Sequence, residues 1–180
     1  MRYQELPVAP PLANHVECIW LLESGAEKES SAPERLLPDG CVELILNFGD
    51  LFREHKEAGQ NELQPERFIV GQMTQPVLVS PTGQVQLVGI RFAPGGTLPF
   101  FPMPPGELTN SIAPLADVAT ALDREFSERP RDARKLPEKI RLIQTLLINH
   151  LNARTEKGAS LHQAIARIVT SGGQVSVDEL

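Results

Sequence analysis

The sequence predicts an α+β fold that is mainly β, with a small β-barrel or sandwich followed by C-terminal helices. Sixteen prolines in 180 residues exceed the usual share of about 5%, and proline disfavours an all-helical body because it breaks helices. Short apolar, β-branched runs separated by turns fill residues 1–105, as is typical of sandwiches and barrels. From residue 114 the spacing of apolar residues becomes helical.

The first half of the chain contains the expected strands. Residues 16–22 are apolar and β-branched enough for one strand, and residues 34–37 are expected to form a short second one, with Leu36 and Leu37 buried and Arg35 exposed. A tight Pro-Asp-Gly turn follows at 38–40. The next strand alternates, so we expect one face with Val42, Leu44, Leu46 and Phe48 and another with Cys41, Glu43, Ile45 and Asn47.

The middle of the chain continues this pattern of strands and turns. Strands are expected at 67–73, 77–80 and 84–92. Residues 50–66 are charged and lack periodicity, so they are expected to form a long hairpin connection. The segment 93–114 holds six prolines and is expected to cover the body as irregular structure that buries Phe100, Phe101 and Met103.

Helices are predicted in the last third of the chain. Five apolar residues between Leu115 and Phe126 share the face of a helix at about 114–128, and a charged break follows at 127–135. A longer helix at about 137–154 has an apolar face wide enough to pack on the body and on a partner helix, and both roles stay open.

The tail carries the signals of two helix starts. Residues 160–163 have the Ser-x-x-Gln form of a capping box, and the helix that follows is expected to bury Leu161, Ile165, Ile168 and Val169 and to end at Gly172-Gly173. Residues 176–179 form another capping box at the end of the sequence. We therefore expect the sequence to be part of a longer chain.

Several of these segments together resemble a known family. Residues 37–44 (LPDGCVEL), 71–72 (GQ) and 89–96 (GIRFAPGG), with the early Trp20 strand, resemble the N-terminal domain of AraC-type transcription regulators. Residues 164–180 resemble the opening of the helix-turn-helix domain of that family. The resemblance implies a cupin-like sensor barrel over 1–112, a helical linker or dimerisation region over 113–157, and the start of a helix-turn-helix domain over 158–180.

The same resemblance implies a function and partners. The full-length protein would control transcription as a homodimer that responds to a small-molecule effector. DNA would be bound only through the C-terminal helix-turn-helix domain, most of which lies beyond Leu180. The alternatives are a cupin-like small-molecule-binding module or enzyme without a regulatory role, and a domain that serves only for dimerisation.

Charge and composition agree with a sensor domain rather than a DNA-binding one. The net charge is −6, and residues 1–133 carry 10 basic and 19 acidic side chains against 7 and 4 in residues 134–180. Nucleic-acid binding normally needs a basic face. No apolar run reaches the length of a membrane span and no signal peptide is evident. We expect a cytoplasmic protein without membrane contact.

Three residues are the candidate ligand-binding site. Arg91 shares the face of Val85 and Leu87 on its strand, and a guanidinium among apolar side chains needs a carboxylate or an anionic ligand. Two interpretations stay open: Arg91 pairs with Asp39 or Glu43, or it binds the carboxylate or phosphate of an effector. Trp20 is either a core residue or a wall of the effector pocket. Glu43 completes the candidate site, with a solvated strand edge as its alternative.

The sequence predicts that the protein is not an enzyme and binds neither a metal nor a cofactor. The four histidines, at positions 15, 55, 150 and 162, show no ligand spacing. No serine has a clear histidine partner and no nucleophile elbow occurs. Cys18 and Cys41 are either a redox pair or a reactive thiol, or else two small buried apolar residues, and we favour the last.

Overall fold

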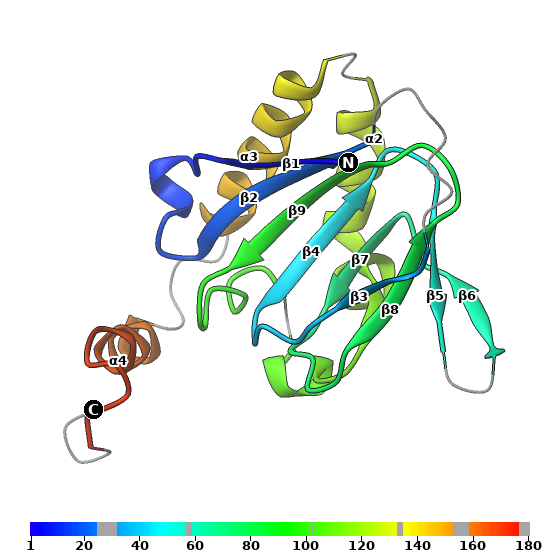
Figure 1. The fold of residues 1–180 in the computed structure, drawn as a ribbon. Coiled ribbons are helices and arrows are strands. Elements are labelled where there is room, and N and C mark those ends of the chain that lie inside the picture. The colour runs from blue at the N-terminus through cyan, green and yellow to red at the C-terminus, as the bar shows by residue number, and fades with distance from the viewer. Residues whose placement is uncertain (25–31, 57–58, 102, 133–134, 153–158, 177–180) are drawn as a thin grey trace.

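Two antiparallel β-sheets face each other and form the body of the protein (Figure 1). The structure is a computed structural model that describes the chain except for residues 25–31, 57–58, 102, 133–134, 153–158 and 177–180. The large sheet has the order β1 (Arg2–Leu6), β2 (Val16–Glu23), β9 (Gln86–Phe92), β4 (Val42–Asn47), β7 (Arg67–Val70) and β10 (Ile112–Pro114). The small sheet has the order β3 (Glu34–Leu36), β8 (Val77–Pro81), β5 (Phe52–His55) and β6 (Asn61–Leu63).

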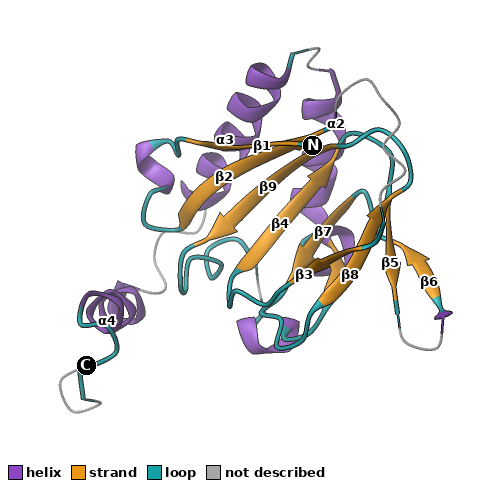
Figure 2. Ribbon diagram, viewed as in Figure 1, coloured by secondary structure: helices purple, strands orange, loops and turns teal. Residues whose placement is uncertain are grey.

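The helices cover the outer face of the large sheet, and its inner face turns toward the small sheet (Figure 2). The short helix η1 (Pro10–Leu12) lies between β1 and β2. After β9 come η3 (Pro105–Leu108), α1 (Leu115–Val118) and the two longer helices α2 (Thr120–Asp132) and α3 (Leu136–Asn152). The last helix, α4 (Ala159–Thr170), stands beside the body, where Ile165 packs against Gly95. The order of layers is therefore helices, large sheet and small sheet.

Strand β4 shows how the sequence produces these layers. Val42, Leu44 and Leu46 belong to the main core under the helices, whereas Ile45 belongs to a smaller cluster between the sheets. Both faces of β4 are covered, so the alternation predicted for this strand separates two apolar environments rather than core from solvent. The main core also takes α-helical residues, namely Leu115, Val118, Leu122, Phe126, Ile143, Leu146 and Leu147.

The expected fold class is confirmed, and the strands at β2, β3, β4, β7, β8 and β9 lie within a few residues of their predicted positions. The proline-rich segment buries Phe100 and Phe101 as expected, and Met103 is half-buried. Four strands were missed. β1, β5 and β6 are polar or charged, and β10 has only three residues inside the proline-rich segment. Hydrogen bonds to a neighbouring strand hold such segments, and the hydrophobic pattern does not record them.

The helices also differ in detail from the prediction. The first one is split at Ala119, whose backbone is not helical (φ −150°, ψ 71°), and α2 continues through the charged segment to Asp132. Charged side chains do not end a helix that is already packed through Leu122 and Phe126. An ion pair between Arg67 Nε and Asp123 Oδ1, 2.7 Å apart, joins α2 to β7.

The end of α4 is the predicted glycine terminus, but its apolar face is not buried. Gly172 and Gly173 have positive φ, and their N–H groups donate to the carbonyls of Val169 and Ile168, which is the Schellman arrangement. The burial predicted for Ile168 and Val169 is wrong, because their exposed fractions are 39% and 57%. Ile165 is half-buried, and the Leu161 side chain and the capping box at 176–179 lie outside the described residues.

In the described part of the chain, no helix has both the length and the apolarity to cross a membrane.

The layered core leads to a stability prediction for α3. Leu147 is fully buried between this helix and the large sheet. We expect Leu147→Ala to lower the free energy of unfolding by about 2–5 kcal/mol, because it leaves a cavity in a packed core. Urea unfolding followed by circular dichroism measures the change. Leu63→Ala is the control, because Leu63 is 56% exposed and its loss is expected to change stability by less than about 0.5 kcal/mol. Equal losses in the two variants would contradict this packing.

Candidate functional site

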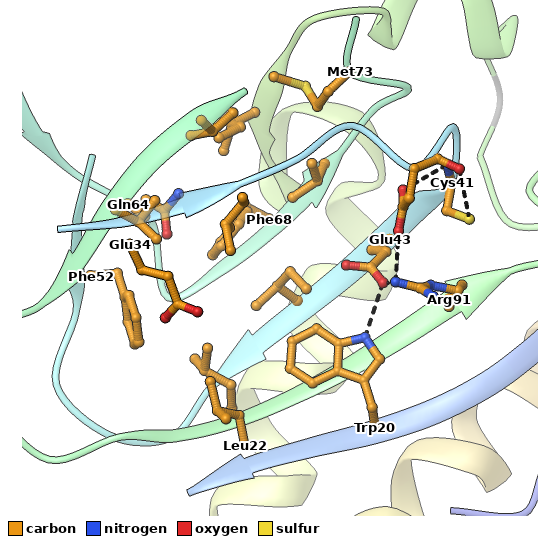
Figure 3. A pocket seen from close by; sticks show the side chains of 18 of the residues that line it. Trp20, Leu22, Glu34, Cys41, Glu43, Phe52, Gln64, Phe68, Met73 and Arg91 are labelled. Carbon is orange, nitrogen blue, oxygen red and sulfur yellow. Dashed lines mark hydrogen bonds and ion pairs between the residues drawn. The ribbon is translucent and has the colours of Figure 1, made fainter. Parts of the chain in front are cut away.

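A cavity of about 510 Å³ lies between the two sheets. Its walls are mostly apolar and come from both sheets, with Leu22, Ile45, Phe68 and Leu87 from the large sheet and Phe52 and Val79 from the small one. A volume of this size is within the range of small-molecule sites. The three candidate residues, Trp20, Glu43 and Arg91, all line it, so the structure brings the predicted site together in one place (Figure 3).

Hydrogen bonds connect the three candidate residues across three neighbouring strands. Glu43 on β4 lies directly opposite Arg91 on β9, and Arg91 Nε donates to Glu43 Oε1 at 2.9 Å. Trp20 on β2 donates its indole N–H to the same oxygen at 3.0 Å. The carboxylate therefore accepts two hydrogen bonds on the inner face of the sheet, one of them charge-assisted. Of the two interpretations left open for Arg91, the structure shows the pairing with carboxylates, and Glu43 is one of the two partners.

A glycine makes the contact between Trp20 and Glu43 possible. Gly89 on β9 lies opposite Trp20 on β2, so the indole has to cross β9 to reach Glu43 on β4. A Cβ atom at position 89 would fall on the indole ring. Glycine is therefore required here for close approach rather than for an unusual backbone angle.

The second partner of Arg91 comes from the predicted turn. Arg91 Nη2 donates to Asp39 Oδ2 at 2.8 Å, while Asp39 Oδ1 accepts from the backbone N–H of Cys41 at 3.0 Å. Gly40 has φ +75°, which glycine tolerates best. Burial alone would lower the pKa of Arg91, but the charge and hydrogen bond of Glu43 and the charge of Asp39 outweigh it and raise that pKa above its ordinary value. Arg91 thus stays charged and holds the turn against the sheet.

The residues at the mouth of the cavity correct one prediction. Leu36 and Leu37 were expected to be buried, but their exposed fractions are 49% and 70%. Both line the cavity, as do Tyr3 and Met1 of the opposite sheet edge. β1 and β3 are edge strands of different sheets and are not paired with each other. The rim of the cavity, formed by Met1, Tyr3, Leu36 and Leu37, therefore lies between two unpaired sheet edges. Arg35 is exposed as expected.

The sequence did not single out Tyr3 and Glu34, which also line the cavity. Tyr3 packs beside Trp20 with ring centroids 6.1 Å apart. Glu34 is exposed at the edge strand β3 and points toward the cavity beside Phe52 (Figure 3). Tyr3 and Glu34 lie on the short, polar edge strands β1 and β3. Only the packing of one sheet against the other shows that both residues face the same cavity.

The cysteines form no disulfide, and one histidine lies within hydrogen-bond distance of a serine in the described part of the chain. Cys18 and Cys41 are free and half-buried, and burial raises the pKa of both thiols, which favours their unreactive protonated form. No group of three potential metal-binding side chains occurs among the described residues. The expectation that no serine has a histidine partner is wrong, because His55 Nε2 and Ser80 Oγ are 2.8 Å apart on adjacent strands. Neither residue lines the cavity.

The shared carboxylate leads to a prediction for the ion pair. Arg91→Met keeps the stem but leaves Glu43, whose side chain is 17% exposed, without its cation. We expect a loss of about 1–3 kcal/mol in unfolding free energy, less than for a fully buried pair because solvent still reaches Arg91. A double-mutant cycle with Glu43→Gln measures the coupling between the two groups. Lys56→Met, which breaks an exposed ion pair with Glu62, is expected to have little effect. A coupling energy of zero would contradict the arrangement.

A second prediction concerns Gly89. Gly89→Ala places a methyl group where the indole lies, so we expect Trp20 to move and its hydrogen bond to Glu43 to break. Because Trp20 is the only tryptophan, the emission spectrum reports this directly and is expected to shift to the red. Gly106→Ala, where a Cβ atom meets open space, is the matched control. An unchanged spectrum in Gly89→Ala would show that the indole does not lie over β9.

Comparison with known proteins identifies the domain but not its activity. Residues 4–114 match the model of a family described as a domain of unknown function, DUF6597. Neither curated proteins nor solved structures give a match. The matched residues run from within β1 to the end of β10 and so include most of both sheets and all of the cavity lining except Met1 and Tyr3. Since they make up more than half of the chain, the protein belongs to the DUF6597 domain family.

Proposed function

We propose that this chain is the effector-sensing part of an AraC-type transcription regulator and that a small molecule binds in the cavity between the sheets. The observation that carries the proposal is the cavity itself, an apolar space with Trp20, Glu43 and Arg91 on one wall. Trp20 would contact the effector directly. Glu43 and Arg91 would position the indole and the 38–40 turn around it. The resemblance of residues 37–44 and 89–96 to regulators of this type supplies the link to transcription.

The placement of β9 supports a regulatory role over a simple binding module. Arg91 lies on this strand, and four residues later Gly95 contacts Ile165 of α4. A ligand that shifts the wall of the cavity would therefore move β9. The residues that follow β9 contact α4, which belongs to the segment resembling the helix-turn-helix opening. Such a ligand would bias the DNA-binding domains between two arrangements. We also propose that the regulator is a cytoplasmic homodimer, with part of α3 available to a partner.

Two other functions remain as candidates. A cupin-like binding module or enzyme would use the same cavity without any coupling to DNA, and a stoichiometric bound metal in the purified protein would favour the enzyme. A domain that only dimerises would show self-association in sedimentation and no response to ligands.

A thermal-shift screen of metabolites tests the effector proposal. Saturating ligand at about 100 times its Kd stabilises by about 2.7 kcal/mol, so we expect a hit to raise Tm by several degrees. The stabilisation is expected to fall in Trp20→Leu, provided that this variant keeps its circular dichroism spectrum. It should persist in Arg35→Ala, which changes an exposed residue outside the cavity. Hits that Trp20→Leu leaves unchanged would place the ligand elsewhere, and unchanged binding in Arg91→Ala would remove Arg91 from the site.

The link to transcription has a separate test. The proposal requires the reading frame to continue beyond Leu180 into further helix-turn-helix pattern, and reporter expression from its operator to respond to a hit from the screen. A frame that continues into an unrelated domain would contradict the regulator but leave the binding cavity in place.

A further inference from the structure

The charged side chains that line the cavity do not balance. Glu34, Asp39 and Glu43 contribute three carboxylates, and Arg91 contributes the one guanidinium among the described lining side chains. Arg91 is already engaged by both Asp39 and Glu43, at 2.8 and 2.9 Å. Its charge is therefore offset before any ligand arrives, and an anionic group would meet an excess of negative charge.

Glu34 is the one of the three lining carboxylates that does not pair with Arg91. Within the described residues it has no ion pair and no hydrogen bond to its side chain. Figure 3 shows it across the cavity from the group formed by Trp20, Glu43 and Arg91, with its carboxylate directed inward beside Phe52. The cavity thus has a hydrogen-bonded charged group at one end, a carboxylate that no described side chain pairs with at the other, and apolar walls between them.

Two aromatic rings and an apolar rim complete the site. Tyr3 and Trp20 both line the cavity and lie 6.1 Å apart with their planes tilted by 33°. Ring faces attract cations as well as flat apolar groups. At the rim, Leu36 and Leu37 expose apolar surface that an entering apolar molecule would cover.

From these observations we propose that the cavity selects an apolar small molecule that carries a cationic group, such as an organic ammonium. The cation is held by Glu34, and the apolar body lies along Phe52 and Val79 toward the indole of Trp20. The inference rests on the proposed function, since it names the chemical class of the effector. It replaces the expectation that Arg91 receives a carboxylate or phosphate, because both of its carboxylate partners are in place.

Three probes of nearly the same shape test this selectivity. They are 4-phenylbutylammonium, 4-phenylbutanol and 4-phenylbutyrate, which share an apolar body and differ in the charge of the head group. Quenching or shift of Trp20 emission measures their affinities, because no other tryptophan contributes. We expect the ammonium to bind at least about tenfold more tightly than the carboxylate, with the alcohol between them. Added salt is expected to weaken only the ammonium.

Variants at two glutamates locate the charge. Glu34→Gln is expected to weaken the ammonium by about three- to tenfold and to leave the alcohol unchanged. Glu34 lies exposed on an edge strand, so the variant is expected to fold. Glu107→Gln is the matched control, since Glu107 is exposed and outside the cavity.

The measured affinities distinguish the charge selectivity of the cavity from the existence of the binding site. Equal or tighter binding of the carboxylate, or no binding of any probe, would overturn the charge selectivity. An unchanged ammonium affinity in Glu34→Gln would overturn the role of Glu34. Neither result removes the proposed effector site, which fails only if the metabolite screen gives no ligand that depends on Trp20.

Discussion

The Glu43 carboxylate, shared between the indole of Trp20 and the guanidinium of Arg91, is the interaction on which the inner face of the large sheet depends. It joins β2, β9 and β4 through side chains, in addition to the backbone ladder that all strands have. Arg91 extends the connection to Asp39 and so fixes the turn before β4. A charged group of this kind, partly removed from water, is favourable only when its partners are in place. The cavity wall is therefore defined by polar contacts, although most of its surface is apolar.

The large sheet has to satisfy two different surroundings at once. Its outer face packs on the helices through a continuous apolar core, and its inner face carries the charged group and a smaller apolar cluster. Because neighbouring side chains on a strand point to opposite faces, β4 meets both demands by alternation alone. A loss of register by one residue would place Glu43 in the main core, so the ion pair and the core packing both favour the same register.

The sequence predicted much of this arrangement where local patterns were strong. The alternation of β9 placed Arg91 among apolar side chains, where it needed a carboxylate or an anionic ligand. The sequence left open which of the two it meets and whether the carboxylate belongs to Asp39 or Glu43. The prediction failed for the short or polar strands β1, β5, β6 and β10 and for the rim. Leu36 and Leu37 are apolar and were expected to be buried, but they border an opening between sheets, and no single-strand pattern reveals such an opening. Glu34 and Tyr3 were missed for the same reason, since their meaning comes from which strands lie opposite each other. The exposed face of α4 could not be predicted because burial depends on which surface a helix meets.

We propose that the space between the sheets is a binding site with Trp20 at one end and Glu34 at the other. A crystal structure of the protein with 4-phenylbutylammonium tests this claim most directly. We expect electron density for the probe between the sheets, with its ammonium within hydrogen-bond distance of Glu34 and its ring toward the indole of Trp20. Density for the probe only outside the cavity, or collapse of the two sheets onto each other with no space between them, would contradict the claim.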